Sequence, residues 1–185
     1  MTDLPEDAHL PEETMWEGRF ITAKRRGRWE YVGRARNIGA AVILAIDDAP
    51  DGRHVILVDQ YRVPLRARCI ELPAGLVGDD DAAPVEEAAL AAARELEEET
   101  GYRAGSMEEV GRFYSSPGMV SESFTLFRAR DLSKVSDGGG IGDEDIVTHR
   151  VPLSGLADWI AQKRAEGYAM DVKLLTLLGG MLLGS

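Results

Sequence analysis

The chain has 185 residues, of which 44% are hydrophobic and 29% charged, and this balance predicts one globular domain with at most a small appendage. Its 32 acidic and 21 basic residues give a net charge of −11, which argues against a nucleic-acid partner because such partners require a basic face. A single cysteine, Cys69, excludes an internal disulfide and suits a reducing compartment. Residues 1–9 lack the features of a signal peptide, and the apolar run at 174–183 is too short to span a bilayer, so we expect a soluble cytoplasmic protein with no membrane partner.

The N-terminal part is predicted to form a β-hairpin. Residues 16–23 and 28–34 are typical of two strands, and the turn between them lies at residues 25–27. Residues 1–14 are expected to fray at the end of the chain. The hairpin therefore precedes the main body of the protein.

Strands mixed with helices are predicted in the rest of the sequence. Residues 40–46 are continuously apolar, as in a buried strand, and a turn follows at residues 47–53. A mobile glycine-rich loop is expected at residues 137–145. This mixture, without strict alternation, predicts an α/β (α+β) fold in which a mixed sheet lies between helices. Further strands are predicted at residues 55–58, 69–72, 124–128 and 146–151, and helices at residues 84–100, 156–164 and 171–183.

The helix predicted at residues 84–100 carries the clearest chemistry. Glu95, Glu98 and Glu99 are spaced i, i+3 and i+4, so they share one face of the helix. Like charges on an exposed helix cost roughly 0.2–0.5 kcal/mol for each pair, and a bound divalent cation removes that cost. Carboxylate oxygens are the ligands that Mg²⁺ prefers, and Mg²⁺ often completes its shell with substrate phosphates. A solvated acidic face is the alternative interpretation.

The surroundings of this helix resemble the signature of the Nudix hydrolase family. That signature runs Gly, five residues, Glu, seven residues, then Arg-Glu-aliphatic-any-Glu-Glu-any-Gly. The chain has Gly75, then Glu86 and, after seven residues, the run at 94–101. Ten residues rather than five separate Gly75 from Glu86, and the acidic run at 79–81 marks the insertion. The resemblance implies a Nudix fold, in which we expect Glu86 to be a structural partner of Arg94 and not a ligand.

The same resemblance implies a metal centre. Glu95, Glu98 and Glu99 would hold two or three Mg²⁺ ions, with Mn²⁺ as a possible replacement, and the backbone carbonyl of Ala74 would be a further ligand. Arg94 would orient the glutamates from behind. The ions would bridge a diphosphate, screen its charge and lower the pKa of an attacking water.

Four stretches resemble the ADP-ribose pyrophosphatase branch of the family. One of them, residues 29–34, is similar to a strand that family members exchange across a homodimer. We therefore expect residues 1–37 to serve dimerisation and base binding, and residues 38–185 to form the hydrolase domain. The four stretches are residues 29–34, residues 59–62 with 71–75, residues 115–118 and residues 142–146.

The N-terminal hairpin supplies candidate contacts for a nucleobase. Trp16 and Trp29 have flat faces on which adenine can stack, and packing within the hairpin is the alternative for each. Glu30 would contact the edge of the adenine. Trp29 is also expected to complete the site of the neighbouring subunit.

Two arginines and a glutamate are candidate contacts for the rest of the substrate. Arg34 and Arg62 offer forked donors to phosphate groups, with a surface ion pair as the alternative. Glu71 would bind a ribose hydroxyl or orient Arg62, with burial beside an arginine as the alternative.

A catalytic base is expected in the loop at 137–145. Glu144 is our choice, since a glycine-rich loop suits a group that swings in after the substrate binds, and Asp143 and Asp145 stay open as alternatives. The predicted reaction converts ADP-ribose and water into AMP and ribose 5-phosphate with Mg²⁺. The alternatives are a hydrolase of another nucleoside diphosphate sugar, such as GDP-mannose, and a non-catalytic ADP-ribose sensor.

Overall fold

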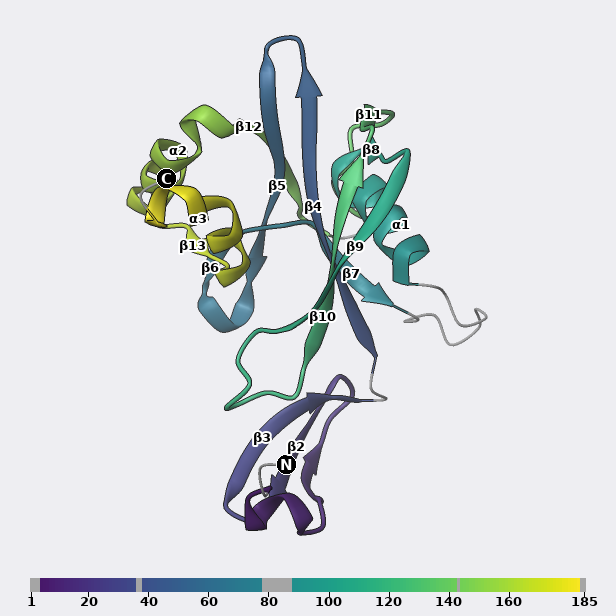
Figure 1. The fold of residues 1–185 in the computed structure, drawn as a ribbon, viewed down its shortest axis with the longest axis vertical. Coiled ribbons are helices and arrows are strands. Elements are labelled where there is room, and N and C mark those ends of the chain that lie inside the picture. Colours follow the sequence, from purple (N-terminus) through teal and green to yellow (C-terminus); the bar gives the residue numbers. More distant parts are fainter. Residues whose placement is uncertain (1–3, 36–37, 78–87, 143, 184–185) are drawn as a thin grey trace.

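The computed structural model describes residues 4–35, 38–77, 88–142 and 144–183 and has two parts, a small N-terminal sheet and a larger α/β body (Figure 1). The N-terminal sheet contains three antiparallel strands, β1 (Glu13–Glu17), β2 (Ile21–Arg26) and β3 (Trp29–Arg34). The prediction of two strands was wrong, because a turn in which the Gly18 N–H donates to the Ile21 carbonyl splits residues 16–23.

The described residues before β1 are also more ordered than the sequence suggested. The 3₁₀ helix η1 (Glu6–His9) precedes β1, which begins at Glu13. Asp7 forms an ion pair with Arg28 at 2.8 Å, and this contact fastens the start of the described chain to the turn between β2 and β3. Fraying over residues 1–14 was therefore a wrong prediction for the described part of that range.

The larger body is built on an eight-stranded mixed sheet. Its main path runs β13-β6-β5-β4-β10-β9, while β12 pairs with β5 and β7 pairs with β4. The β4–β10 and β6–β13 pairs are parallel and the other pairs are antiparallel. The strands are β4 (Gly39–Ala49), β5 (Gly52–Arg62), β6 (Ala67–Glu71), β7 (Ala74–Val77), β9 (Ser106–Tyr114), β10 (Ser123–Arg130), β12 (Val147–Pro152) and β13 (Ala169–Met170).

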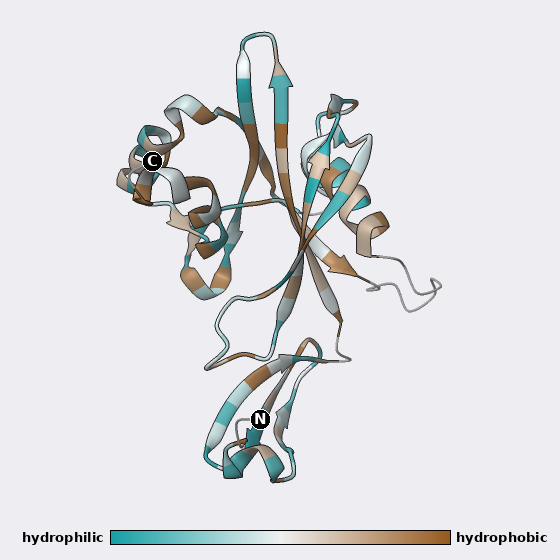
Figure 2. Cartoon of the chain, viewed as in Figure 1, coloured by the Kyte–Doolittle hydropathy of each residue, from teal (hydrophilic) through white to brown (hydrophobic). Residues whose placement is uncertain are grey.

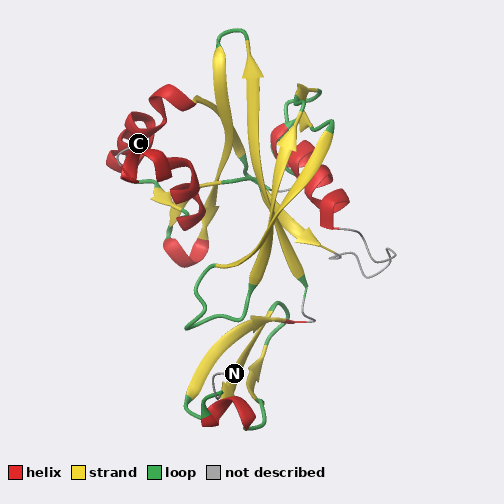
Figure 3. Ribbon diagram, in the orientation of Figure 1, coloured by secondary structure: helices red, strands yellow, loops and turns green. Residues whose placement is uncertain are grey.

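Helices cover both faces of this sheet, as the sequence predicted (Figure 3). Successive side chains of a strand point to opposite faces, so Ala41 and Ile43 of β4 face the helix α1 (Ala88–Thr100). Val42 of β4 faces the other core, which packs against α2 (Leu156–Ala165) and α3 (Leu175–Leu183). The strands are accordingly apolar along their central lengths (Figure 2).

Helix α1 ends where the sequence places its end. Gly101 has a φ of +70°, in the left-handed region that favours glycine, and its N–H donates to the Glu97 carbonyl at 2.8 Å. Residues 78–87 lie outside the described residues, so the acidic run at 79–81 and Glu86 are not placed. No helix of the described chain is both long enough and apolar enough to cross a membrane.

The remaining secondary-structure elements are short. The strands β8 (Tyr102–Arg103) and β11 (Ser133–Lys134) pair with each other beyond the end of α1. Besides η1, the described residues form 3₁₀ turns at η3 (Val63–Leu65), η4 (Leu153–Gly155) and η5 (Val172–Leu174).

The N-terminal sheet is tied to the segment between β9 and β10. Val32 of β3 donates to the Met119 carbonyl at 3.0 Å and accepts from the Ser121 N–H at 2.9 Å. Arg34, at the end of β3, forms an ion pair with Glu122 at 2.5 Å. These contacts bring the end of β3 to the mouth of the cavity described next.

Candidate functional site

A cavity of about 510 Å³ lies between the sheet and α1. Its wall combines residues of β3, β4, β5, β6, β7, β10, α1 and η5 with residues of three connecting segments. Residues that the sequence singled out and that line this cavity are Arg34, Arg62, Glu71, Ala74, Glu95, Glu99 and Glu144. The cavity therefore joins groups that are up to 110 positions apart in the chain.

The α1 side of the cavity is a pair of partly buried carboxylates. Glu99 is 5% exposed, and one of its oxygens accepts a hydrogen bond from the Ala74 N–H at 3.1 Å. The pKa of Glu99 is raised to about 8, chiefly by burial and also by the nearby charges of Glu95 and Glu144, against the lowering effect of the Ala74 N–H. Burial also raises the pKa of Glu95. Both carboxylates therefore hold protons more tightly than an exposed glutamate does.

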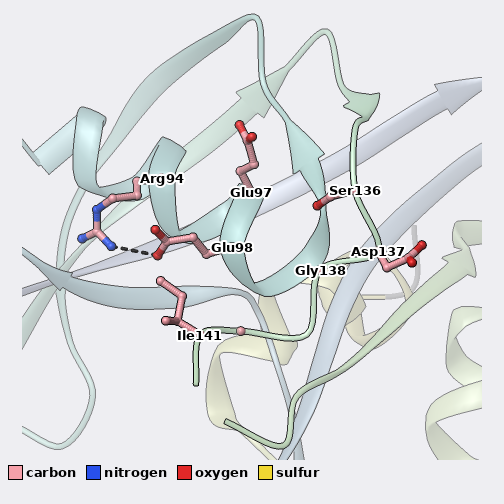
Figure 4. A pocket seen from close by; sticks show the side chains of 8 residues that line it. Arg94, Glu97, Glu98, Ser136, Asp137, Gly138 and Ile141 are labelled. Atoms are coloured by element: carbon pink, nitrogen blue, oxygen red, sulfur yellow. Dashed lines mark hydrogen bonds and ion pairs between the residues drawn. The ribbon is translucent and has the colours of Figure 1, made fainter. Parts of the chain in front are cut away.

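Glu98 faces a different hollow. Its carboxylate pairs with Arg94 at 2.9 Å, and the same guanidinium reaches Glu95 at 3.0 Å. The hollow, of about 600 Å³, lies between α1 and the glycine-rich loop, with Ile141 beside Glu98 (Figure 4). Among the described residues, no three His, Cys, Asp or Glu side chains are close enough to form a ready metal site. Glu98 must turn away from Arg94 before it can join Glu95 and Glu99.

The opposite wall carries an arginine held by a buried glutamate. Arg62 donates from Nε and Nη2 to the two oxygens of Glu71 at 2.6 and 2.8 Å. Glu71 is 6% exposed, while the Arg62 side chain is 42% exposed. This forked pair fixes the plane of the guanidinium and leaves the rest of its edge facing the cavity.

Cations in the cavity wall are each paired with a carboxylate of the same wall. Lys173 pairs with Asp171 at 2.7 Å, just as Arg34 pairs with Glu122 and Arg62 with Glu71. Three cations thus face six carboxylates, because Glu95, Glu99 and Glu144 also line the space. Electrostatics alone would repel an anionic ligand from this cavity unless positive charge were added.

The glycine-rich loop is fastened to the end of α1. The N–H groups of Gly139 and Gly140 donate to the carbonyls of Glu99 and Glu98 at 2.8 and 3.0 Å. A mobile loop was predicted here. Its upstream end is instead held by these two hydrogen bonds, and its downstream end by hydrogen bonds between Arg68 and Asp145. Within it, Glu144 accepts a hydrogen bond from the Ile141 N–H at 2.9 Å and lines the cavity.

The two alternatives to Glu144 are placed differently. Asp143 lies outside the described residues. Asp145 is not part of the cavity wall, and its side chain is 76% exposed where it pairs with Arg68.

The hairpin residues expected to bind a base lie away from this cavity in the single chain. The ring of Trp16 covers Gly18, where a Cβ atom would lie 2.3 Å from the ring. Trp29 lines a separate hollow of about 420 Å³ together with Tyr31 and Pro117. Glu30 is exposed beside Trp29. The structure therefore groups Arg34 alone, among the expected N-terminal residues, with the carboxylates of α1.

Several cavity residues had no assigned role in the sequence. Gln60 and Ser115 belong to stretches that resemble the family, so their positions could have been inferred from those stretches. Asp171 and Lys173 lie around η5, in a segment whose apolar pattern predicts only a helix. Nothing local in the sequence points to Glu122 or Phe124.

Comparisons with known proteins match this architecture. A family model described as the NUDIX domain matches residues 36–168. Methanol dehydrogenase activator of Bacillus methanolicus is 34% identical over 171 residues, which cover 89% of this chain and 88% of that protein. ADP-ribose pyrophosphatase of Bacillus subtilis is 37% identical over 109 residues, 59% of this chain and 55% of that protein.

Two further matches cover more of the chain than the Bacillus subtilis enzyme. GDP-mannose pyrophosphatase of Cronobacter sakazakii is 35% identical over 151 residues, 77% of this chain and 72% of that protein. A crystal structure of an ADP compounds hydrolase superposes with a TM-score of 0.66 and 25% identity, and the match covers 95% of this chain and 93% of that one.

Proposed function

The chain belongs to the Nudix hydrolase family, and we propose that it hydrolyses the diphosphate of ADP-ribose to AMP and ribose 5-phosphate with the help of Mg²⁺. The observation that carries the proposal is the excess of carboxylates in a cavity that also holds oriented cations. The similarity to an ADP-ribose pyrophosphatase and to an ADP compounds hydrolase supports ADP-ribose as the substrate.

The carboxylates of α1 suit a divalent cation. Glu99 is buried and Glu95 is half-buried on the same wall, both with raised pKa values, and a cation would offset the cost of burying their charges and their mutual repulsion. Glu98, once turned from Arg94, and the carbonyl of Ala74 would complete the ligand set. When bound, the ions would screen the charge of the diphosphate and lower the pKa of an attacking water. Mn²⁺ can take the same oxygen ligands.

The cations of the cavity wall suit the phosphates. Arg62 is already oriented by Glu71, so it loses little conformational freedom when a phosphate oxygen approaches. Arg34 and Lys173 lie on the same wall and can share their protons between a carboxylate and the substrate. Arg94, which contacts Glu95 at 3.0 Å, would keep Glu95 in place from behind after Glu98 has turned away.

Glu144 is the proposed base. It lines the same cavity as Glu95 and Glu99, and as the base it would accept a proton from a water held between these groups. The proton of that water would pass to the Glu144 carboxylate as the oxygen attacks phosphorus. The bond to the leaving phosphate oxygen breaks in the same displacement, which yields the two monophosphates.

Base recognition is assigned to a second copy of the chain. We propose a homodimer in which residues 1–37 bring Trp16, Trp29 and Glu30 toward the cavity of the neighbouring hydrolase domain, residues 38–185. Trp16 and Trp29 are 57% and 48% exposed, which leaves aromatic surface for a partner or an adenine ring.

A substrate panel tests the specificity. The protein is incubated with Mg²⁺ and equal concentrations of ADP-ribose or GDP-mannose, and the nucleoside monophosphate is measured. We expect AMP to form at least ten times faster than GMP. Faster GMP release would favour the alternative suggested by the GDP-mannose pyrophosphatase relative. Tight binding of ADP-ribose without turnover would instead indicate a sensor.

A further inference from the structure

Arg68 of β6 bridges the sheet and the segment that carries Glu144. Its Nε donates to the carboxylate of Asp59 on β5, and its Nη2 donates to the Asp59 carbonyl at 3.1 Å. On its other side, Nη1 donates to the Asp145 carboxylate at 2.5 Å and Nη2 to the Asp145 carbonyl at 3.0 Å. One guanidinium therefore binds both the side chain and the backbone of Asp145.

The sheet end of this bridge is rigid. Asp59 is 1% exposed, and its second oxygen lies 2.5 Å from Nε2 of His149 on β12. The His149 ring is in turn packed edge-on against Trp159 of α2, with 5.2 Å between ring centroids. A buried carboxylate held from two strands gives Arg68 a fixed anchor.

The loop end of the bridge lies one residue from the proposed base. Glu144 directly precedes Asp145. Upstream, the loop is fastened to α1 through the N–H groups of Gly139 and Gly140. Only residues 141–144 lie between the two fastenings, so the bond to Arg68 limits how far the Glu144 backbone can move.

We propose that Arg68 is a positioning residue, which holds Asp145 as a tether so that Glu144 stays at the cavity wall. The kinetic part of this inference rests on the proposed function and on Glu144 as the base. Asp145 is then not the base, although it is one of the three acidic residues of the loop. A displacement of about 1 Å in a catalytic group can cost on the order of 10²-fold in rate, which is why a tether matters.

Hydrogen exchange without substrate tests the tether itself. Asp145→Ala removes an exposed side chain, and Arg68→Lys keeps the charge but loses the fork that joins Asp59 to Asp145. We expect faster amide exchange at residues 141–146 in both variants. The matched control is Arg150→Lys, because Arg150 bridges Asp47 and Asp51 on the same body away from the cavity. Unchanged exchange at residues 141–146 in both Asp145→Ala and Arg68→Lys would overturn the proposal.

Kinetics then separates a tether from a base. In Asp145→Asn and Asp145→Ala we expect kcat for ADP-ribose to fall about tenfold with KM nearly unchanged, while the acidic limb of the pH profile persists. Glu144→Gln should lose far more activity and that limb as well. If Asp145→Asn lost the limb and Glu144→Gln kept it, Asp145 would be the base and the proposal would be wrong.

The hydrogen-exchange experiment and the kinetic experiment can fail independently of each other. If the wild type hydrolyses no nucleoside diphosphate sugar, the proposed function fails, and the exchange measurement still decides whether Arg68 tethers the loop. If the wild type is active and both Asp145→Ala and Arg68→Lys match it in kcat, the proposed function stands and the positioning role of Arg68 is refuted.

Discussion

Gly75 lies directly against the side chain of Glu95, so that a Cβ atom at position 75 would stand 2.0 Å from Cδ of Glu95. Gly75 belongs to β7 and Glu95 to α1, so this contact sets how closely the strand approaches the carboxylate face of the helix. Glycine is required here for space, since its φ lies outside the left-handed region.

Gly75→Ala should therefore displace Glu95 without unfolding the protein, because the obstacle is the end of a flexible side chain. We expect at least a tenfold loss of activity and weaker activation by Mg²⁺, with a small change in Tm. The measurement is AMP release over a Mg²⁺ titration, with a thermal melt of each variant. Gly39→Ala is the control, since a Cβ there would meet Val77 at an ordinary 3.9 Å. Equal losses in both variants would refute the specific role of position 75.

The pKa of Glu99 predicts how stability depends on pH in the absence of metal. Burial raises this pKa from 4.5 to about 8, so between these values the folded state holds a proton that the unfolded state has released. Stability must then fall as pH rises from 5 to 8, by at most about 1.4 kcal/mol for each pH unit. Thermal melts in a chelator should show this fall in the wild type and a flatter profile in Glu99→Gln.

Mg²⁺ should oppose that loss. A cation competes with the proton for Glu99, so its stabilising effect is expected to be larger at pH 8 than at pH 6. A Tm that responds equally to Mg²⁺ in the wild type and in Glu99→Gln would show that the cation binds elsewhere.

Substitutions in the Arg62–Glu71 pair distinguish an effect on folding stability from an effect on substrate binding. Arg62→Ala leaves the Glu71 carboxylate buried without its forked partner and should cost about 1–2 kcal/mol, a range reduced because the arginine is partly exposed. The double variant Arg62→Ala/Glu71→Gln should recover most of that stability. Its KM for ADP-ribose should stay raised, because the phosphate donor is still missing. A double variant with normal KM would exclude Arg62 from substrate binding.

The core of the fold could be predicted because its patterns are local. The apolar run at 40–46 lies within β4, the helix ends at Gly101, and the i, i+3, i+4 spacing of Glu95, Glu98 and Glu99 follows from helix geometry. The strand β9 escaped prediction because it lies at the edge of the sheet, where most of its side chains are exposed and its pattern is polar.

The cavity depends on contacts that no local pattern contains. Lys173 reaches it because η5 follows β13, which pairs in parallel with β6 beside Glu71. Glu98 shares a helical face with Glu99, yet Arg94 at i−4 draws its carboxylate into the neighbouring hollow. Spacing predicts which side chains can meet, and competing ion pairs decide which ones do.

The most direct test of the central claim is AMP release from ADP-ribose in Mg²⁺, measured side by side for the wild type and Glu98→Gln. Glu98 is partly exposed and outside the core, so its substitution should leave the fold intact. The account predicts rapid AMP release by the wild type and a loss of at least a hundredfold in the variant. Equal release by both proteins, or none by a folded wild type, would contradict it.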